Sequence, residues 1–239
     1  MPIHGSLFTD FQEIASNQQF QLQNKKLLKV MMNFGPVQCL EGSMVAYQGD
    51  VRFQKKSQGM GRMLKGAVTG EGVSLMEAGG QGELFLASRA QEVQVMYLEN
   101  DMVTINGSSI LAFSSSIQWD IQRVQGKGAK ALMGGAMAGG LFNVVLRGTG
   151  YVAVTTDGEP VALDVASAPT FADPQAVVLW TAGVTTSLNA DSGGLGTMLR
   201  GGTGETFQVA FGGQGYVLIQ PSEGVVQGAS QPSSGGIFG

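Results

Sequence analysis

Three stretches of the sequence share one pattern, namely GVSLMEAGGQGELFLA (72–87), GLFNVVLRGTGYVAVT (140–155) and ETFQVAFGGQGYVLIQ (205–220). Each stretch reads as a β-strand, then Gly-x-Gly, then a second β-strand. The glycine pairs are Gly80/Gly82, Gly148/Gly150 and Gly213/Gly215, so their second members lie 68 and 65 residues apart. Because glycine reaches positive φ without steric cost, we expect each pair to form a tight hairpin turn between its two strands.

A second set of residues precedes the glycines in the same order. The aromatic residues Tyr47, Trp119 and Trp180 lie 35, 31 and 35 residues before the second glycine of each pair. Self-similarity at a fixed period is the signature of a repeated unit. We therefore predict an N-terminal segment (1–19), three β units (20–90, 91–158 and 159–225) and a flexible Gly/Ser tail (226–239).

The units are predicted to be all-β. Apolar and polar residues alternate around Trp119 and again from Phe207 to Phe211, which is typical of strands with one buried face. Residues 18–23 and 26–31 read as a hairpin that turns at Asn24-Lys25. Units of this size bury little surface alone and leave free strand edges, so we expect them to share edges within a symmetric homo-oligomer.

Composition excludes several kinds of chemistry. The chain has one His and one Cys among 239 residues, which excludes a His-rich metal site, a Cys/His zinc site and an intrachain disulfide. Cys39 reads as a buried thiol, and no Gly-x-Ser-x-Gly elbow occurs. The glycine pairs lack the Lys-Ser or Lys-Thr that a phosphate-binding loop needs. We therefore predict no catalytic residue, no metal site, no cofactor and no enzymatic activity.

Three blocks of the sequence resemble the altered-inheritance-of-mitochondria-24 family. They are GSMVAYQGDVRF (42–53), MLKGAVTGE (63–71) and TGETFQVAFGGQGYVLIQ (203–220), and the match covers most of residues 18–224. The resemblance implies three tandem domains similar to the trp RNA-binding attenuation protein (TRAP), each a β-sandwich or short double-stranded β-helix related by a pseudo-threefold repeat. It also implies a trimer whose nine domains form a ring, and it carries over no catalytic residue. The mitochondrial member of the family is associated with inner-membrane organisation.

Positive charge is concentrated in the first unit. Eight basic and two acidic residues lie between positions 25 and 65, a net charge of +6 in a chain of net charge −4. Such a patch can focus anions or a phospholipid surface, although a solvated face is the simpler interpretation. The candidate anion- or partner-binding residues are Lys25, Lys26, Lys29, Arg52, Lys55, Lys56, Arg62 and Lys65.

The most apolar window, residues 131–146, offers a second candidate. Its 16 residues are too few to span a membrane as a helix. Met133, Met137, Leu141 and Phe142 are candidates for an exposed apolar contact loop, because Met and Gly adapt to varied partners. The alternative is that residues 141–146 form a core strand.

These features favour a non-catalytic oligomeric scaffold or binding protein associated with membrane or envelope assemblies. The alternative is a module that binds small anions or nucleic acid through the basic first unit. Nucleic acid is disfavoured as a partner because the chain is acidic overall and few aromatic residues lie among the basic ones. We expect a bacterial, cytoplasmic protein that is peripheral at a membrane, with a membrane or protein partner.

Overall fold

The protein is all-β. The structure is a computed structural model, and it describes residues 4–55, 73–123, 142–190 and 207–222. The elements are α1 (Leu7–Asp10), β1 (Phe20–Asn24), β2 (Leu27–Met31), β3 (Val37–Leu40), β4 (Met44–Gln54), β5 (Leu75–Leu86), β6 (Glu92–Asn106), β7 (Ile110–Ser114), β8 (Gln118–Arg123), β9 (Phe142–Thr156), β10 (Val161–Asp164), β11 (Thr170–Ala172), β12 (Val177–Thr181), β13 (Val184–Ala190), β14 (Phe207–Gly213) and β15 (Tyr216–Ile219), with 3₁₀ turns at Met32–Phe34 and Gly107–Ser109.

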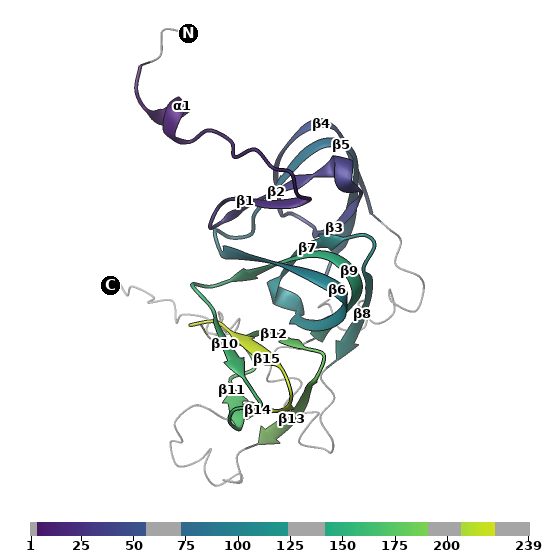
Figure 1. Cartoon of the computed structure of the whole chain (residues 1–239), viewed down its shortest axis with the longest axis vertical. Helices are drawn as coiled ribbons and strands as arrows, with labels where there is room; N and C mark the ends of the chain where they lie inside the picture. Colours follow the sequence, from purple (N-terminus) through teal and green to yellow (C-terminus); the bar gives the residue numbers. More distant parts are fainter. Residues whose placement is uncertain (1–3, 56–72, 124–141, 191–206, 223–239) are drawn as a thin grey trace, which may run out of the picture.

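Twelve of the described strands form one sheet and three form another. The large sheet runs β1-β2-β5-β3-β7-β9-β6-β12-β15-β10, with β4 paired to β5 and β8 paired to β9. The small sheet has the order β11-β14-β13. Figure 1 shows β4 and β5 at one end of the long axis and β11, β13 and β14 at the other. The chain therefore advances along the molecule from its first strands to its last.

The predicted first hairpin is present, but it turns at Lys25-Lys26, one residue later than the predicted Asn24-Lys25. β1 and β2 pair antiparallel, with Phe20 opposite Val30 and Asn24 opposite Leu27. The strands predicted around Trp119 and over residues 207–211 are also present, as β8 and β14. In both cases the alternation of apolar and polar residues gave the correct element, because the pleat places successive side chains on opposite faces.

The glycine pairs do not form hairpin turns, and that prediction was wrong. Gly80 and Gly82 lie inside the continuous strand β5, and Gly148 and Gly150 lie inside β9. Gly213 and Gly215 stand where β14 ends and β15 begins. The chain therefore continues past each pair instead of reversing, and each long strand can pair with several neighbours.

Glycine is required at these positions for close approach between strands. Gly82 has a φ of +134°, and a Cβ there would lie 2.0 Å from the backbone oxygen of Gln48 on β4. A Cβ on Gly80 would lie 2.1 Å from the backbone oxygen of Asp50. Positive φ and a touching backbone both favour glycine. The repeated Gly-x-Gly pattern therefore marks a bend within a strand and not a turn between two strands.

The strands β4, β7 and β12 begin with the same irregularity. In each, the first residue pairs with a neighbouring strand (β5, β9 and β15, respectively), one residue is skipped, and the next two residues pair with that strand again. An aromatic residue ends this pattern each time, and the three pairs are Tyr47 opposite Leu84, Phe113 opposite Val152 and Trp180 opposite Val217. The skipped residue is a β-bulge.

This register corrects the aromatic residue assigned to the predicted middle unit (91–158). Trp119 lies on β8 opposite Leu146, whereas Phe113 on β7 occupies the position that Tyr47 and Trp180 hold elsewhere. The two aromatic rings are neighbours, with centroids 6.2 Å apart. Sequence spacing alone chose the wrong member of the pair, because both are aromatic residues on strands beside the same core.

Substituting Gly82 with Ala should destabilise the fold by about 2–4 kcal/mol, because the new Cβ meets the Gln48 backbone at a positive φ. Gly79→Ala is the matched control, since its Cβ would find only Pro36 Cβ at 3.7 Å, an ordinary contact. Urea unfolding of the two variants measures the difference. Equal midpoints for both variants would contradict the proposed role of this bend.

Candidate functional site

The basic residues predicted to form one patch occupy several environments. Lys25 and Lys26 are exposed in the turn between β1 and β2. Among the described members of the set they are the two that form no ion pair with another described residue. Lys56, Arg62 and Lys65 lie outside the described residues.

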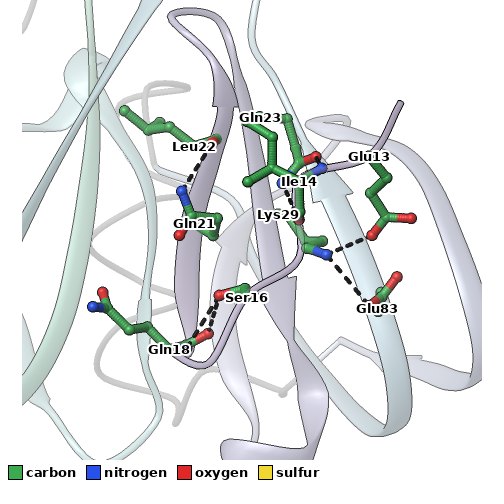
Figure 2. A network of polar contacts seen from close by, with 9 residues as sticks. All are labelled: Glu13, Ile14, Ser16, Gln18, Gln21, Leu22, Gln23, Lys29 and Glu83. Atoms are coloured by element: carbon green, nitrogen blue, oxygen red, sulfur yellow. Dashed lines mark hydrogen bonds and ion pairs between the residues drawn. The ribbon is translucent and has the colours of Figure 1, made fainter. Parts of the chain in front are cut away.

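Lys29 is buried, so it offers no surface charge to an anion. It is 1% exposed, and its Nζ lies 2.5 Å from Oε1 of Glu13 and 3.4 Å from Oε1 of Glu83. Figure 2 shows the N-terminal segment crossing the β1–β2 hairpin and bringing Glu13 to this ammonium group. Lys29 alternates with the core residues Leu28 and Val30, a position that reads as solvent-facing in the sequence.

The ion pair shifts the pKa values of both partners. Burial acts to lower the pKa of Lys29, but the hydrogen bond to Glu13 and the charges of Glu83 and Glu13 outweigh it and raise that pKa above its ordinary value. The hydrogen bond from Lys29 lowers the pKa of Glu13. Both groups are therefore charged at neutral pH, and Lys29 fastens the N-terminal segment to the sheet.

Arg52 and Lys55 also have carboxylate partners. The Arg52 guanidinium donates two hydrogen bonds to Asp50, with Nη2 2.9 Å from Oδ2 and Nε 3.2 Å from Oδ1. Lys55 Nζ lies 2.9 Å from Oε1 of Glu41. Three of the five candidate basic residues that the structure describes are thus paired with nearby acids, which weakens the local positive field.

A shallow hollow of about 390 Å³ lies beside Arg52. Its lining residues are Asp50, Arg52, Gln54, Glu77, Gly79, Gly80 and Gln81. Glu77 Oε2 accepts a hydrogen bond from Gln38 Nε2 at 2.6 Å. Two carboxylates against one guanidinium make this a polar surface without the excess positive charge that an anion site needs.

Of the predicted apolar loop, only Phe142 falls within the described residues. It begins β9, and its ring covers Gly107, where a Cβ would lie 2.2 Å from Phe142 Cε2. Val144, Val145 and Leu146 follow it and are buried. Residues 142–146 therefore form a core strand, while Met133, Met137 and Leu141 lie outside the described residues.

Chemically reactive groups are sparse in the described ranges. Cys39 is buried, and burial raises the pKa of its thiol to about 12, so it remains a protonated, poor nucleophile at neutral pH. No group of three or more His, Cys, Asp or Glu side chains that could hold a metal ion occurs there. No helix in the same ranges is long and apolar enough to cross a membrane.

Sequence reasoning missed an exposed apolar edge on β4. Met44, Val45 and Tyr47 are 41%, 59% and 48% exposed, and we call these three residues the β4 edge. The corresponding strand β7 is fully buried. The two strands read alike in the sequence, so no local signal distinguishes the exposed strand from the buried one.

A second exposed apolar set lies near the N-terminus. Leu7, Phe8 and Phe11 belong to α1 or follow it directly, and all three are exposed. We call them the N-terminal arm. Figure 1 shows this segment extending away from the strands, although Lys29 and Glu13 fix its base. Apolar side chains exposed this far are typical of a surface that contacts a partner.

A comparison with models of known protein families identifies the family of this chain. A family model described as mitochondrial biogenesis AIM24 matches residues 20–222. The chain belongs to the AIM24 family. This confirms the resemblance that the three sequence blocks indicated, since all of them lie within the matched range.

A solved structure shares the fold of this AIM24-family chain. It is the X-ray crystal structure of a Streptococcus pyogenes protein, with a TM-score of 0.63 and 21% sequence identity over 85% of this chain and 92% of that chain. At this identity the likeness shows the fold. A comparison with curated proteins found no match.

Replacing Glu13 with Gln should loosen the N-terminal segment, because Lys29 loses its nearest carboxylate. Chymotrypsin cleavage after Phe11 at neutral pH should become roughly two- to five-fold faster, a modest factor because Glu13 is partly exposed. Asp10→Asn is the control, since Asp10 is exposed and forms no ion pair among the described residues. Unchanged cleavage in Glu13→Gln would show that Lys29 does not fasten the segment.

Proposed function

We propose that the protein is a non-catalytic scaffold in which three chains close into a ring and present one binding surface repeatedly at a membrane or envelope assembly. Each chain contributes three TRAP-like units, over residues 20–90, 91–158 and 159–225. Surfaces repeated within one assembly bind together, so contacts that are weak singly give high avidity. The ring is cytoplasmic and peripheral to the membrane, and it carries no cofactor.

The proposed repeat is supported by strand register. β4, β7 and β12 carry the same bulge, and in each case an aromatic residue follows it. The residues opposite those aromatics are Leu84, Val152 and Val217, and each lies two positions after the second glycine of its pair. A bulge is a local irregularity, so finding it three times at one place relative to the glycines favours three copies of one unit.

The observation that carries the proposed assembly is the exposed β4 edge. A strand that leaves its backbone groups unpaired beside apolar side chains is a template for another strand. Natural monomers protect such edges with charge, proline or a covering loop. The β4 edge has the apolar residues Met44, Val45 and Tyr47 instead, and a protein partner that covers them is the simplest explanation for their exposure.

The proposed place at a membrane is supported by the N-terminal arm. Leu7, Phe8 and Phe11 expose large apolar side chains on one short segment. Lys25 and Lys26 add exposed positive charge in the turn between β1 and β2. Apolar side chains together with cations are the two features that hold a peripheral protein on an anionic bilayer.

The alternative of an anion- or nucleic acid-binding module has less support. Lys29 is buried, and Arg52 and Lys55 are paired with Asp50 and Glu41. The positive charge that motivated that interpretation is therefore largely balanced among the described residues.

The assembly predicts a mass in solution. Size-exclusion chromatography with light scattering should give three times the 24.9 kDa chain mass. Because the proposed contacts are partly apolar, the assembly should persist at high salt. A monomer of 24.9 kDa would overturn the scaffold proposal, and a stable dimer would overturn its threefold symmetry.

The membrane location predicts vesicle binding. The protein should float with vesicles containing phosphatidylserine, and the triple variant Leu7→Ser/Phe8→Ser/Phe11→Ser should reduce the bound fraction about tenfold. Tyr97→Ser/Val161→Ser/Tyr216→Ser is the matched control, since these side chains are also large, apolar and exposed. Equal loss in both variants, or no flotation of the unaltered protein, would contradict the membrane proposal.

A further inference from the structure

Two seams inside the chain have the same register. β3 pairs with β7, with Gln38 opposite Phe113 and Cys39 opposite Ala112. β6 pairs with β12, with Thr104 opposite Trp180 and Ile105 opposite Leu179. In both seams the aromatic residue is the one that follows the bulge. In both cases, therefore, a strand of one unit (β3 or β6) pairs with the bulged strand of the next unit (β7 or β12).

The bulged strand β4 has no such neighbour among the described strands. Tyr47 holds the position of Phe113 and Trp180, opposite Leu84 on β5. Among the described strands, β7 pairs with β9 and also β3, and β12 pairs with β15 and also β6, whereas β4 pairs with β5 alone. The side of β4 that would carry the seam is exposed at Tyr47.

The other half of a seam is also left over, on β11. Gln38 and Thr104 pair within their own units with Glu77 and Val145, which lie three positions before the first glycine of each pair. At the third glycine pair the residue in that position is Ala210, and it lies opposite Phe171 of β11. Within the described strands β11 pairs with β14 alone, and Phe171 is 53% exposed.

We infer that β11 of one chain pairs antiparallel with β4 of a second copy of this chain. In the register of the two internal seams, Phe171 lies opposite Tyr47, Ala172 opposite Ala46 and Thr170 opposite Gln48. This inference rests on the proposed ring and names the contact that closes it. The new strand pair would satisfy backbone groups on both edges and bury two exposed aromatic side chains against each other.

The position of the two edges requires separate chains. Figure 1 shows β4 at one end of the molecule's long axis and β11 at the other. The two edges also differ in sequence, so the contact is head-to-tail. Contacts of this kind propagate from chain to chain until the rotation between copies closes a ring.

Engineered cysteines test the pairing directly. The double variant Tyr47→Cys/Phe171→Cys, oxidised after purification, should give covalent multimers that reductant dissolves, ending at the ring. A short bis-maleimide reagent covers a pair whose geometry does not suit a disulfide. Buried Cys39 does not interfere, since its thiol remains protonated.

The matched control is Tyr97→Cys/Phe171→Cys, because Tyr97 is exposed to nearly the same extent, 55%, but lies outside the proposed seam. It should remain monomeric on a denaturing gel. Tyr47→Cys alone should form no covalent dimer, because a head-to-tail contact never brings two Tyr47 positions together. A covalent dimer of the single variant would overturn the seam in favour of face-to-face pairing.

Charge exchange gives a second readout that does not depend on cysteine chemistry. Tyr47→Glu/Phe171→Glu places like charges opposite each other and should dissociate the assembly. Tyr47→Glu/Phe171→Lys should restore most of the assembled fraction in light scattering. Urea unfolding of each variant confirms that the chain itself remains folded.

The outcomes separate this inference from the function on which it rests. A light-scattering trimer that forms no Tyr47–Phe171 cross-link would overturn the seam and leave the scaffold intact. A monomeric unaltered protein would overturn both. A trimer with the cross-link, and with its partial rescue by opposite charges, would support both.

Discussion

The structure depends on two long strands, β5 and β9, each of which continues through a pair of glycines. A flat strand offers two edges to two neighbours, but β5 pairs with β2, β3 and β4, and β9 pairs with β6, β7 and β8. The bend at Gly80 and Gly82 makes this arrangement accessible, because strand backbones there approach within the space that a Cβ would occupy. Glycine at these positions therefore determines the connectivity of the fold as well as its local shape.

Burial of the bulged strands follows from this connectivity. β7 lies between β3 and β9, and β12 lies between β6 and β15, so both edges of each strand are paired. Phe113 is fully buried as a result, while Tyr47 on β4 is half exposed in the same position. The difference follows from strand pairing, because β4 pairs with β5 alone among the described strands.

The sequence predicted the features that local pattern determines. Alternating residues identified β8 and β14, the hairpin of β1 and β2 was correct, and the family followed from three short blocks. The sequence-based predictions were wrong where contacts between residues far apart in the sequence determine the structure. The glycine pairs were interpreted as turns because glycines adopt positive φ both in a bend within a strand and in a turn that reverses the chain. Lys29 read as exposed because nothing near it in sequence shows that Glu13 crosses the hairpin.

The outermost strands differ in what they expose, and this difference argues for a partner at β4 and β11. The outer strand β1 carries the polar residues Gln21, Gln23 and Asn24, and Gln23 exchanges hydrogen bonds with the Ile14 backbone. The outer strand β13 exposes the polar residues Thr185, Thr186 and Ser187. Tyr47 and Phe171 stand on edges of the same kind with large apolar side chains. Apolar side chains in place of polar ones on an exposed edge do not stabilise a monomer, and they promote non-specific association. The outer strand β10 also exposes the apolar residue Val161. Tyr47 and Phe171 are larger, and their edges lie at opposite ends of the molecule, as a head-to-tail contact between copies requires.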